Sequence, residues 1–184
     1  MYTTATTNDE LIQILSLQQM NLKSAVSDLE MEQEGFVTVH HTLDILTRMN
    51  NACPHIIAKD GDKVVGYALS MTEDFKDEIS VLRPMFIEME NISIQNFITM
   101  GQICVAKTHR KMGIFRGLYN AMKIASYPKY DAIITEVDAT NSRSLGAHYA
   151  VGFKKNMHLQ FFGPRLGIDF FEDGLNCTFQ KRNT

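Results

Sequence analysis

The segment from Phe97 to Phe153 places the strongest constraint on how this chain folds. It predicts an apolar strand, a basic turn containing Gly113, a helix, a second apolar strand, and a second helix that ends at Gly152. Two strands that are joined through a helix are expected to lie parallel, with a right-handed crossover. The turn enters its helix with backbone N–H groups and basic side chains, a combination that suits an anion such as phosphate.

The rest of the chain predicts a mixed α/β fold with a central sheet. We expect further helices at 7–22, 21–34 and 41–49, a hairpin joining 55–58 to 64–71 around Asp60-Gly61, a charged surface excursion at 72–90, and late strands at 159–162 and 176–180. Thr7 and Glu10 have the spacing of a capping box, and Asp-Gly between apolar runs is a strong hairpin signal. The sheet is expected to be single, mixed and mostly antiparallel, with helices on both faces.

Composition limits the classes to which the protein can belong. The chain has 184 residues, of which 45% are hydrophobic, so we expect one domain over residues 1–184. A net charge of −3 argues against nucleic-acid binding, which normally needs a basic face. The polar start, and the lack of any apolar run of roughly 18 residues, predict no membrane span and a cytoplasmic location. Cys53, Cys104 and Cys177 lack metal-site spacing, so we expect reduced thiols and no metal.

Three sets of residues between Phe97 and Phe153 resemble the GNAT superfamily of N-acetyltransferases. Residues 110–115 match the family turn Q/R-x-x-G-x-G/A at Arg110 and Gly113, with Phe115 where the pattern has Gly or Ala. The second helix carries the family spacing at Asn141, Ser144 and 152–153. Glu136 and His148 are twelve positions apart, which is the separation of the acidic residue and its partner in members resembling ribosomal-protein alanine acetyltransferases.

The resemblance implies a GNAT-like fold with acetyl-CoA as co-substrate, bound where two parallel strands splay apart. Turn N–H groups would hold the coenzyme A pyrophosphate, and the preceding strand would pair with pantetheine through a bulge. The residues that it assigns to the cofactor are Ile103, Cys104, Val105, His109, Arg110, Lys111, Met112, Gly113, Ile114, Phe115, Arg116, Asn141 and Ser144.

The same resemblance assigns three candidate catalytic residues. Glu136 would take the proton of the attacking amine, directly or through water; the alternative is a strand carboxylate that faces solvent or pairs with a lysine. His148 stands where the family usually has Tyr, and it would serve the departing thiolate; the alternative is a structural histidine. Tyr149, the next residue, is the substitute for His148 if the helix is rotated.

The predicted function is transfer of an acetyl group to a primary amine by direct attack in a ternary complex. The acceptor would be a small molecule or a peptide. The alternative is an acyl-CoA-binding sensor without catalysis. Aromatic residues near the end of the chain, at 161–162 and 170–171, would pack on their own core or on a second copy, so a homodimer is one expected arrangement.

Overall fold

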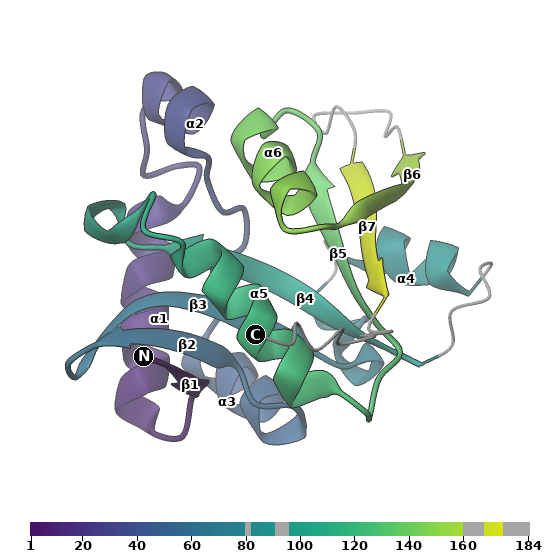
Figure 1. Ribbon diagram of the computed structural model, residues 1–184, viewed down its shortest axis with the longest axis horizontal. Coiled ribbons are helices and arrows are strands. Elements are labelled where there is room, and N and C mark those ends of the chain that lie inside the picture. The colour runs from purple at the N-terminus through teal and green to yellow at the C-terminus, as the bar shows by residue number, and fades with distance from the viewer. Residues whose placement is uncertain (80–81, 91–95, 160–167, 175–184) are drawn as a thin grey trace, which may run out of the picture.

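A computed structural model describes residues 1–79, 82–90, 96–159 and 168–174 of the protein. Its strands form one sheet in the order β1-β2-β3-β4-β5-β7-β6 (Figure 1). Neighbouring strands are antiparallel except for β4 and β5, which are parallel, so the predicted fold class is confirmed. The strands are β1 Tyr2–Thr4, β2 Ile56–Asp60, β3 Lys63–Met71, β4 Phe97–Val105, β5 Ala132–Asp138, β6 Lys154–Leu159 and β7 Ile168–Gly174.

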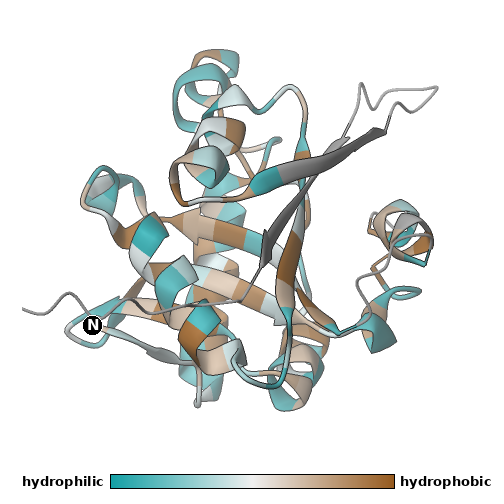
Figure 2. Ribbon diagram, turned by 45° about the vertical axis from the view of Figure 1, so that its right-hand side comes forward, coloured by the Kyte–Doolittle hydropathy of each residue, from teal (hydrophilic) through white to brown (hydrophobic). Residues whose placement is uncertain are grey.

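Helices cover both faces of the sheet, and each face has its own core. Leu118 and Met122 of α5 pack on one face, whereas α1, α3 and α4 contribute to the core on the other. Hydrophilic and hydrophobic residues alternate along the helices, as expected when one side of a helix rests on a sheet (Figure 2). The helices are α1 Asn8–Asn21, α2 Asp28–Glu34, α3 Leu43–Ala52, α4 Arg83–Met89, α5 Ile114–Ser126 and α6 Ser142–Ala150, with 3-10 turns η1 Glu73–Phe75 and η2 Lys107–His109.

Local signals in the sequence explain where several elements begin. The Thr7 hydroxyl accepts a hydrogen bond from the Glu10 N–H at 3.2 Å, and the Glu10 carboxylate accepts one from the Thr7 N–H at 3.1 Å. This reciprocal pair confirms the predicted capping box. Gly61 turns the β2–β3 hairpin with a positive φ of 56°, which only glycine adopts without strain.

Three predicted segments differ from the structure. The described residues at 72–79 and 82–90 do not form a surface excursion, because Phe75, Met85 and Phe86 are buried in the core beside α1 and α3. The helix predicted at 21–34 is broken: α1 ends at Asn21, and α2 begins after its own capping residue, Ser27. The strand predicted at 159–162 overlaps β6 only at its first residue; its remainder, like the strand at 176–180, lies outside the described residues.

The parallel strands β4 and β5 separate after three paired residues. Pairing joins Phe97–Thr99 to Ala132–Ile134 and extends no further in the described register. On its other side β4 contains a bulge, because the register with β3 skips Gly101. The bulge reverses the alternation, so that Met100 before it and Ile103 after it both contact the α5 side. The two strands therefore open into a wedge beside α5.

Candidate active site

A cavity of about 370 Å³ lies where β4 and β5 diverge. Its walls come from the end of β4, the turn leading into α5 with the first residues of that helix, the whole length of α6, and the end of α2 with the segment that follows it. Figure 1 shows α2 and α6 on the same side of the molecule, above the start of α5. The predicted cofactor residues that line it are Ile103, Cys104, Val105, His109, Arg110, Lys111, Gly113, Ile114, Phe115, Arg116, Asn141 and Ser144.

The start of α5 presents backbone donors at one end of this cavity. Gly113 is the residue that precedes the helix; its φ is 79°, and no side chain caps the first turn. Lys111 also has a positive φ, of 64°. N–H groups at an uncapped helix start, together with the helix dipole, favour an anion. Met112, the one predicted turn residue that does not line the cavity, has an exposed side chain.

Arg110 is held by protein groups. Its guanidinium donates to the Glu34 carboxylate at 2.8 Å, to the Asn21 side-chain oxygen at 2.7 Å, and to the Val105 carbonyl at 3.2 Å. The hydrogen bond from Arg110 lowers the pKa of Glu34 below its usual value. Arg110 therefore joins the end of β4 to α1 and α2, a connection that no local sequence pattern predicts.

Asn141 connects the two walls of the cavity. Its side-chain oxygen accepts from the Ser144 N–H at 3.1 Å and so caps α6, as predicted. Its side-chain nitrogen donates to the Phe36 carbonyl at 3.2 Å. Because Asn141 is buried and both of its polar atoms are bonded, it holds the segment after α2 against α6.

Cys104 lines the cavity as a buried thiol. Burial raises its pKa to about 11, so the thiol stays protonated at neutral pH. A protonated thiol is a poor nucleophile, so Cys104 is not activated for covalent catalysis in this arrangement.

His148 lies behind the cavity wall. It is only 1% exposed and does not line the cavity. Its Nδ1 is 2.7 Å from the Ser144 carbonyl, which can only accept, so Nδ1 carries the proton and Nε2 accepts from the Tyr119 hydroxyl at 2.7 Å. Burial lowers the pKa of His148 to about 4. The role of His148 toward the departing thiolate stays a prediction. In this arrangement the imidazole is neutral, and its N–H at Nδ1 already donates to the Ser144 carbonyl.

The other two predicted catalytic residues also lie outside the cavity lining. Glu136 is half-buried on β5, and strand alternation places it on the face opposite Ile133 and Val137, which pack toward α5. Tyr149 is half exposed on α6. The structure thus brings the predicted cofactor residues, except Met112, together along the cavity. The predicted catalytic residues lie outside the cavity lining. Their roles stay predictions.

Sequence reasoning missed several residues that line the cavity. Asn21, Glu34 and residues 35–37 come from a segment far from the turn in sequence, and nothing local marks them. Arg143 also lines the cavity. A signal for it was present, because Arg143 lies two positions after Asn141, within the first turn of a helix already assigned to the site.

Two kinds of feature are absent from the described residues. In the described ranges no helix has both the length and the apolar character needed to span a membrane. Within the same ranges, no group of three or more histidine, cysteine or acidic side chains is arranged to hold a metal ion.

Comparison with solved structures shows that the fold is shared widely. The ribosomal-protein-S18-alanine N-acetyltransferase of Escherichia coli is 10% identical, with a TM-score of 0.67 over 100% of this chain and 99% of that one. The ribosomal-protein-alanine N-acetyltransferase of Brucella melitensis is 20% identical, with a TM-score of 0.61 over 95% and 99%. The acetyltransferase yncA of Salmonella typhimurium, described as putative and solved with acetyl-CoA, is 15% identical, with a TM-score of 0.64 over 96% and 94%.

A search of curated proteins found no match. The model of the acetyltransferase (GNAT) family, in contrast, matches residues 20–153, which is most of the chain. This range contains the splayed strands, the turn into α5 and the capped helix α6. The chain therefore belongs to the acetyltransferase (GNAT) family.

Proposed function

We propose that this protein transfers an acetyl group from acetyl-CoA to a primary amine, in a ternary complex and without an acyl-enzyme intermediate. The observation that carries the proposal is the wedge between β4 and β5, which opens into a cavity that ends at the uncapped start of α5. The acetyl-CoA bound to the Salmonella typhimurium protein supports the choice of cofactor.

The residues present fit such a co-substrate. The first-turn N–H groups of α5 would bind the pyrophosphate. Beyond Thr99 the backbone of β4 is not paired with the backbone of β5, so its groups after Met100 can pair with the amides of pantetheine as a neighbouring strand would. The Thr135 hydroxyl donates to the Met100 carbonyl at 2.9 Å, which satisfies that group where the strands begin to part.

The reaction forms a C–N bond and breaks a C–S bond. The attacking amine must be neutral, and Glu136 on β5 is the proposed acceptor of its proton. An N–H near Val105 would donate to the oxygen of the tetrahedral intermediate. The departing sulfur leaves as a thiolate and takes up a proton. The face of β5 that carries Glu136 is opposite the one packed toward α5, so we infer that the amine arrives from the α1 side.

Filling the cavity tests the proposal. Ala147 lines it from α6, whereas Ala125 is exposed on α5 and does not line it. Thiol release from acetyl-CoA should be measured over a panel of small amines and peptides. We expect turnover with at least one acceptor, a loss of turnover in Ala147→Phe, and wild-type turnover in Ala125→Phe.

The outcomes separate the proposal from its alternative. Binding of acetyl-CoA without thiol release over the whole panel would favour the sensor. Equal activity of Ala147→Phe and Ala125→Phe, both folded, would show that the chemistry takes place elsewhere.

A further inference from the structure

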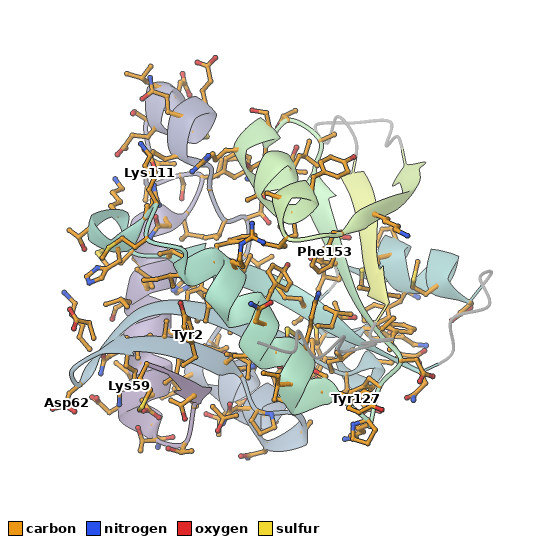
Figure 3. All side chains as sticks on the ribbon, in the orientation of Figure 1. Tyr2, Lys59, Asp62, Lys111, Tyr127 and Phe153 are labelled. Carbon is orange, nitrogen blue, oxygen red and sulfur yellow. The ribbon has the colours of Figure 1, made fainter. Side chains whose placement is uncertain are left out.

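We propose that His41 binds a neutral carbonyl group of the acceptor in a second cavity, which lies along residues 38–42. This inference rests on the proposed function and narrows its acceptor to peptides and amino-acid amides. The second cavity has a volume of about 570 Å³ and shares no lining residue with the coenzyme cavity, which Lys111 lines close to α2 (Figure 3). Val37 lines the coenzyme cavity and Thr38 lines the second one, so the two cavities are neighbours along one segment.

Gln18 of α1 fixes the ring of His41. The Gln18 side-chain oxygen accepts from the His41 backbone N–H at 3.1 Å, so the amide nitrogen of Gln18 is the atom available to the ring. This nitrogen donates to His41 Nδ1 at 3.1 Å, a closer approach than the 3.4 Å between Nδ1 and the Gln18 oxygen. Burial lowers the pKa of His41 to about 4, so the imidazole is neutral at pH 7. Because Nδ1 accepts, the proton of the neutral ring is on Nε2.

The Nε2–H of His41 is a donor directed at the second cavity. His41 is only 5% exposed, and it lines that cavity. In the part of the chain that the structure describes, no group accepts a hydrogen bond from Nε2, and Nε2 is not fully enclosed by protein atoms. A nearly buried N–H without an acceptor costs free energy, and a ligand carbonyl would satisfy it.

A network of buried polar side chains holds this donor in place. The Tyr67 hydroxyl donates to the Gln102 side-chain oxygen at 2.6 Å, and the Gln102 amide nitrogen donates to the Val39 carbonyl at 2.8 Å. Gln18 from α1 and Gln102 from β4 therefore bind alternate residues, His41 and Val39, of the same extended segment. Because Gln102 directly follows the bulge of β4, the network ties the wall of the second cavity to the opening of the wedge.

The charges at this cavity favour a neutral carbonyl over other ligands. Arg48 donates to both Asp44 and Glu78, and these three side chains line the cavity with a net charge of −1. This excess disfavours a carboxylate ligand. A protonated polyamine has only donors, so it cannot accept from His41. A peptide supplies both groups that are needed, an amine for the wedge and a carbonyl for His41.

Acceptor preference tests the inference with the full chain and acetyl-CoA. Thiol release should be measured with short peptides that have a free N-terminus, and with putrescine and spermidine. We expect kcat/KM to be at least about ten-fold higher for the best peptide than for either polyamine.

A matched pair of variants tests the positioning role of Gln18. Gln18→Leu removes the amide that orients His41, whereas Gln19→Leu makes the same change at the exposed neighbouring residue. We expect the KM for the peptide to rise about five-fold or more in Gln18→Leu, with kcat within about two-fold, and both constants to be unchanged in Gln19→Leu. Equal KM values in the two variants would overturn the role of Gln18 and the orientation of His41 that depends on it.

Nuclear magnetic resonance of the unaltered protein observes the donor directly. Long-range proton–nitrogen spectra at pH 7 should show His41 protonated at Nε2, and the Nε2–H resonance should shift when the best peptide is added with coenzyme A. A resonance that does not shift, or polyamines acetylated as efficiently as peptides, would overturn the inference while the proposed function stands. Failure of every amine to release thiol would instead reject the proposed function, and the His41 resonance would still decide whether a peptide binds in this cavity.

Discussion

The phenyl ring of Phe115 meets the imidazole of His148 edge to face, with ring centroids 5.2 Å apart and planes at 89°. These are the two positions at which the chain departs from the family motifs, since Phe115 replaces Gly or Ala and His148 replaces Tyr. The departures touch each other, and both also contact Tyr119. Phe115 lines the cavity, and His148 supports it from behind. His148 therefore contributes to the packing that positions Phe115 at the cavity wall.

Substituting His148 tests whether it is a support or an acid. His148→Ala removes a buried ring together with the Nε2 atom that accepts from the Tyr119 hydroxyl, so we expect a loss of about 2–4 kcal/mol in the free energy of unfolding. Urea unfolding measures this, with His→Ala at exposed His40 as the control. Unchanged stability, combined with a fall in kcat of about 100-fold, would instead assign His148 to the chemistry.

Glu136 is the proposed base, and its substitution has a distinct signature. Glu136→Gln keeps the size of the side chain and removes the proton acceptor, so kcat should fall by about 100-fold or more. The affinity of this variant for coenzyme A should stay within about two-fold of that of the unaltered protein, because Glu136 does not line the cavity. Steady-state kinetics and titration measure the two quantities, with Glu→Gln at exposed Glu32 as the control. A kcat equal to that of the control would remove Glu136 from the mechanism.

The ion pair between Glu34 and Arg110 should hold α2 in place. No residue of α2 is buried, so the helix depends on polar contacts such as Glu34 with Arg110 and Glu30 with Lys107. Glu34→Gln should lower the free energy of unfolding by about 1 kcal/mol, a value that allows for partial solvent exposure of the pair. Hydrogen exchange should increase in α2 and stay unchanged in α1. Equal exchange in Glu34→Gln and Glu32→Gln would refute this role.

Acid should destabilise the fold before its carboxylates titrate. Burial lowers the pKa of His41 to about 4, of His55 to about 3 and of His148 to about 4, whereas an unfolded histidine titrates near 6.5. Below pH 6.5 the unfolded chain therefore binds protons that the folded chain does not, and stability falls as pH falls.

The expected slope is up to about 1.4 kcal/mol per pH unit for each histidine, from pH 6.5 down to about pH 4. Urea unfolding at pH 7, 6 and 5 measures it. In His148→Gln, compared with His40→Gln, the slope of the free energy of unfolding against pH should decrease by the contribution of one histidine. A free energy of unfolding that is constant from pH 7 to pH 5 would show that these side chains are not buried as neutral groups.

Local patterns predicted the elements around the site closely. β4 spans Phe97–Val105 as the apolar run indicated, and α6 begins after Asn141, whose side chain caps it. Such signals act between residues a few positions apart. The bulge at Gly101 could not be located in the same way, because it exists only relative to the register of β3. Residues 72–90 show the same limit of local patterns. Their charges predicted a solvent-exposed segment, whereas their described apolar residues pack into the core.

The sequence by itself determined the family, the order of strands and helices around the turn, and the residues that begin α5 and α6, because these depend on short-range spacing and backbone preferences. Only the tertiary structure decided which cations face the cavity. Arg110, which the sequence predicts to bind a phosphate, lines the cavity, and its guanidinium is also bound to Glu34 and Asn21, which are distant in the chain. The physical reason is that a charged side chain acts through whichever partner folding brings within hydrogen-bonding distance, and sequence spacing does not specify that partner.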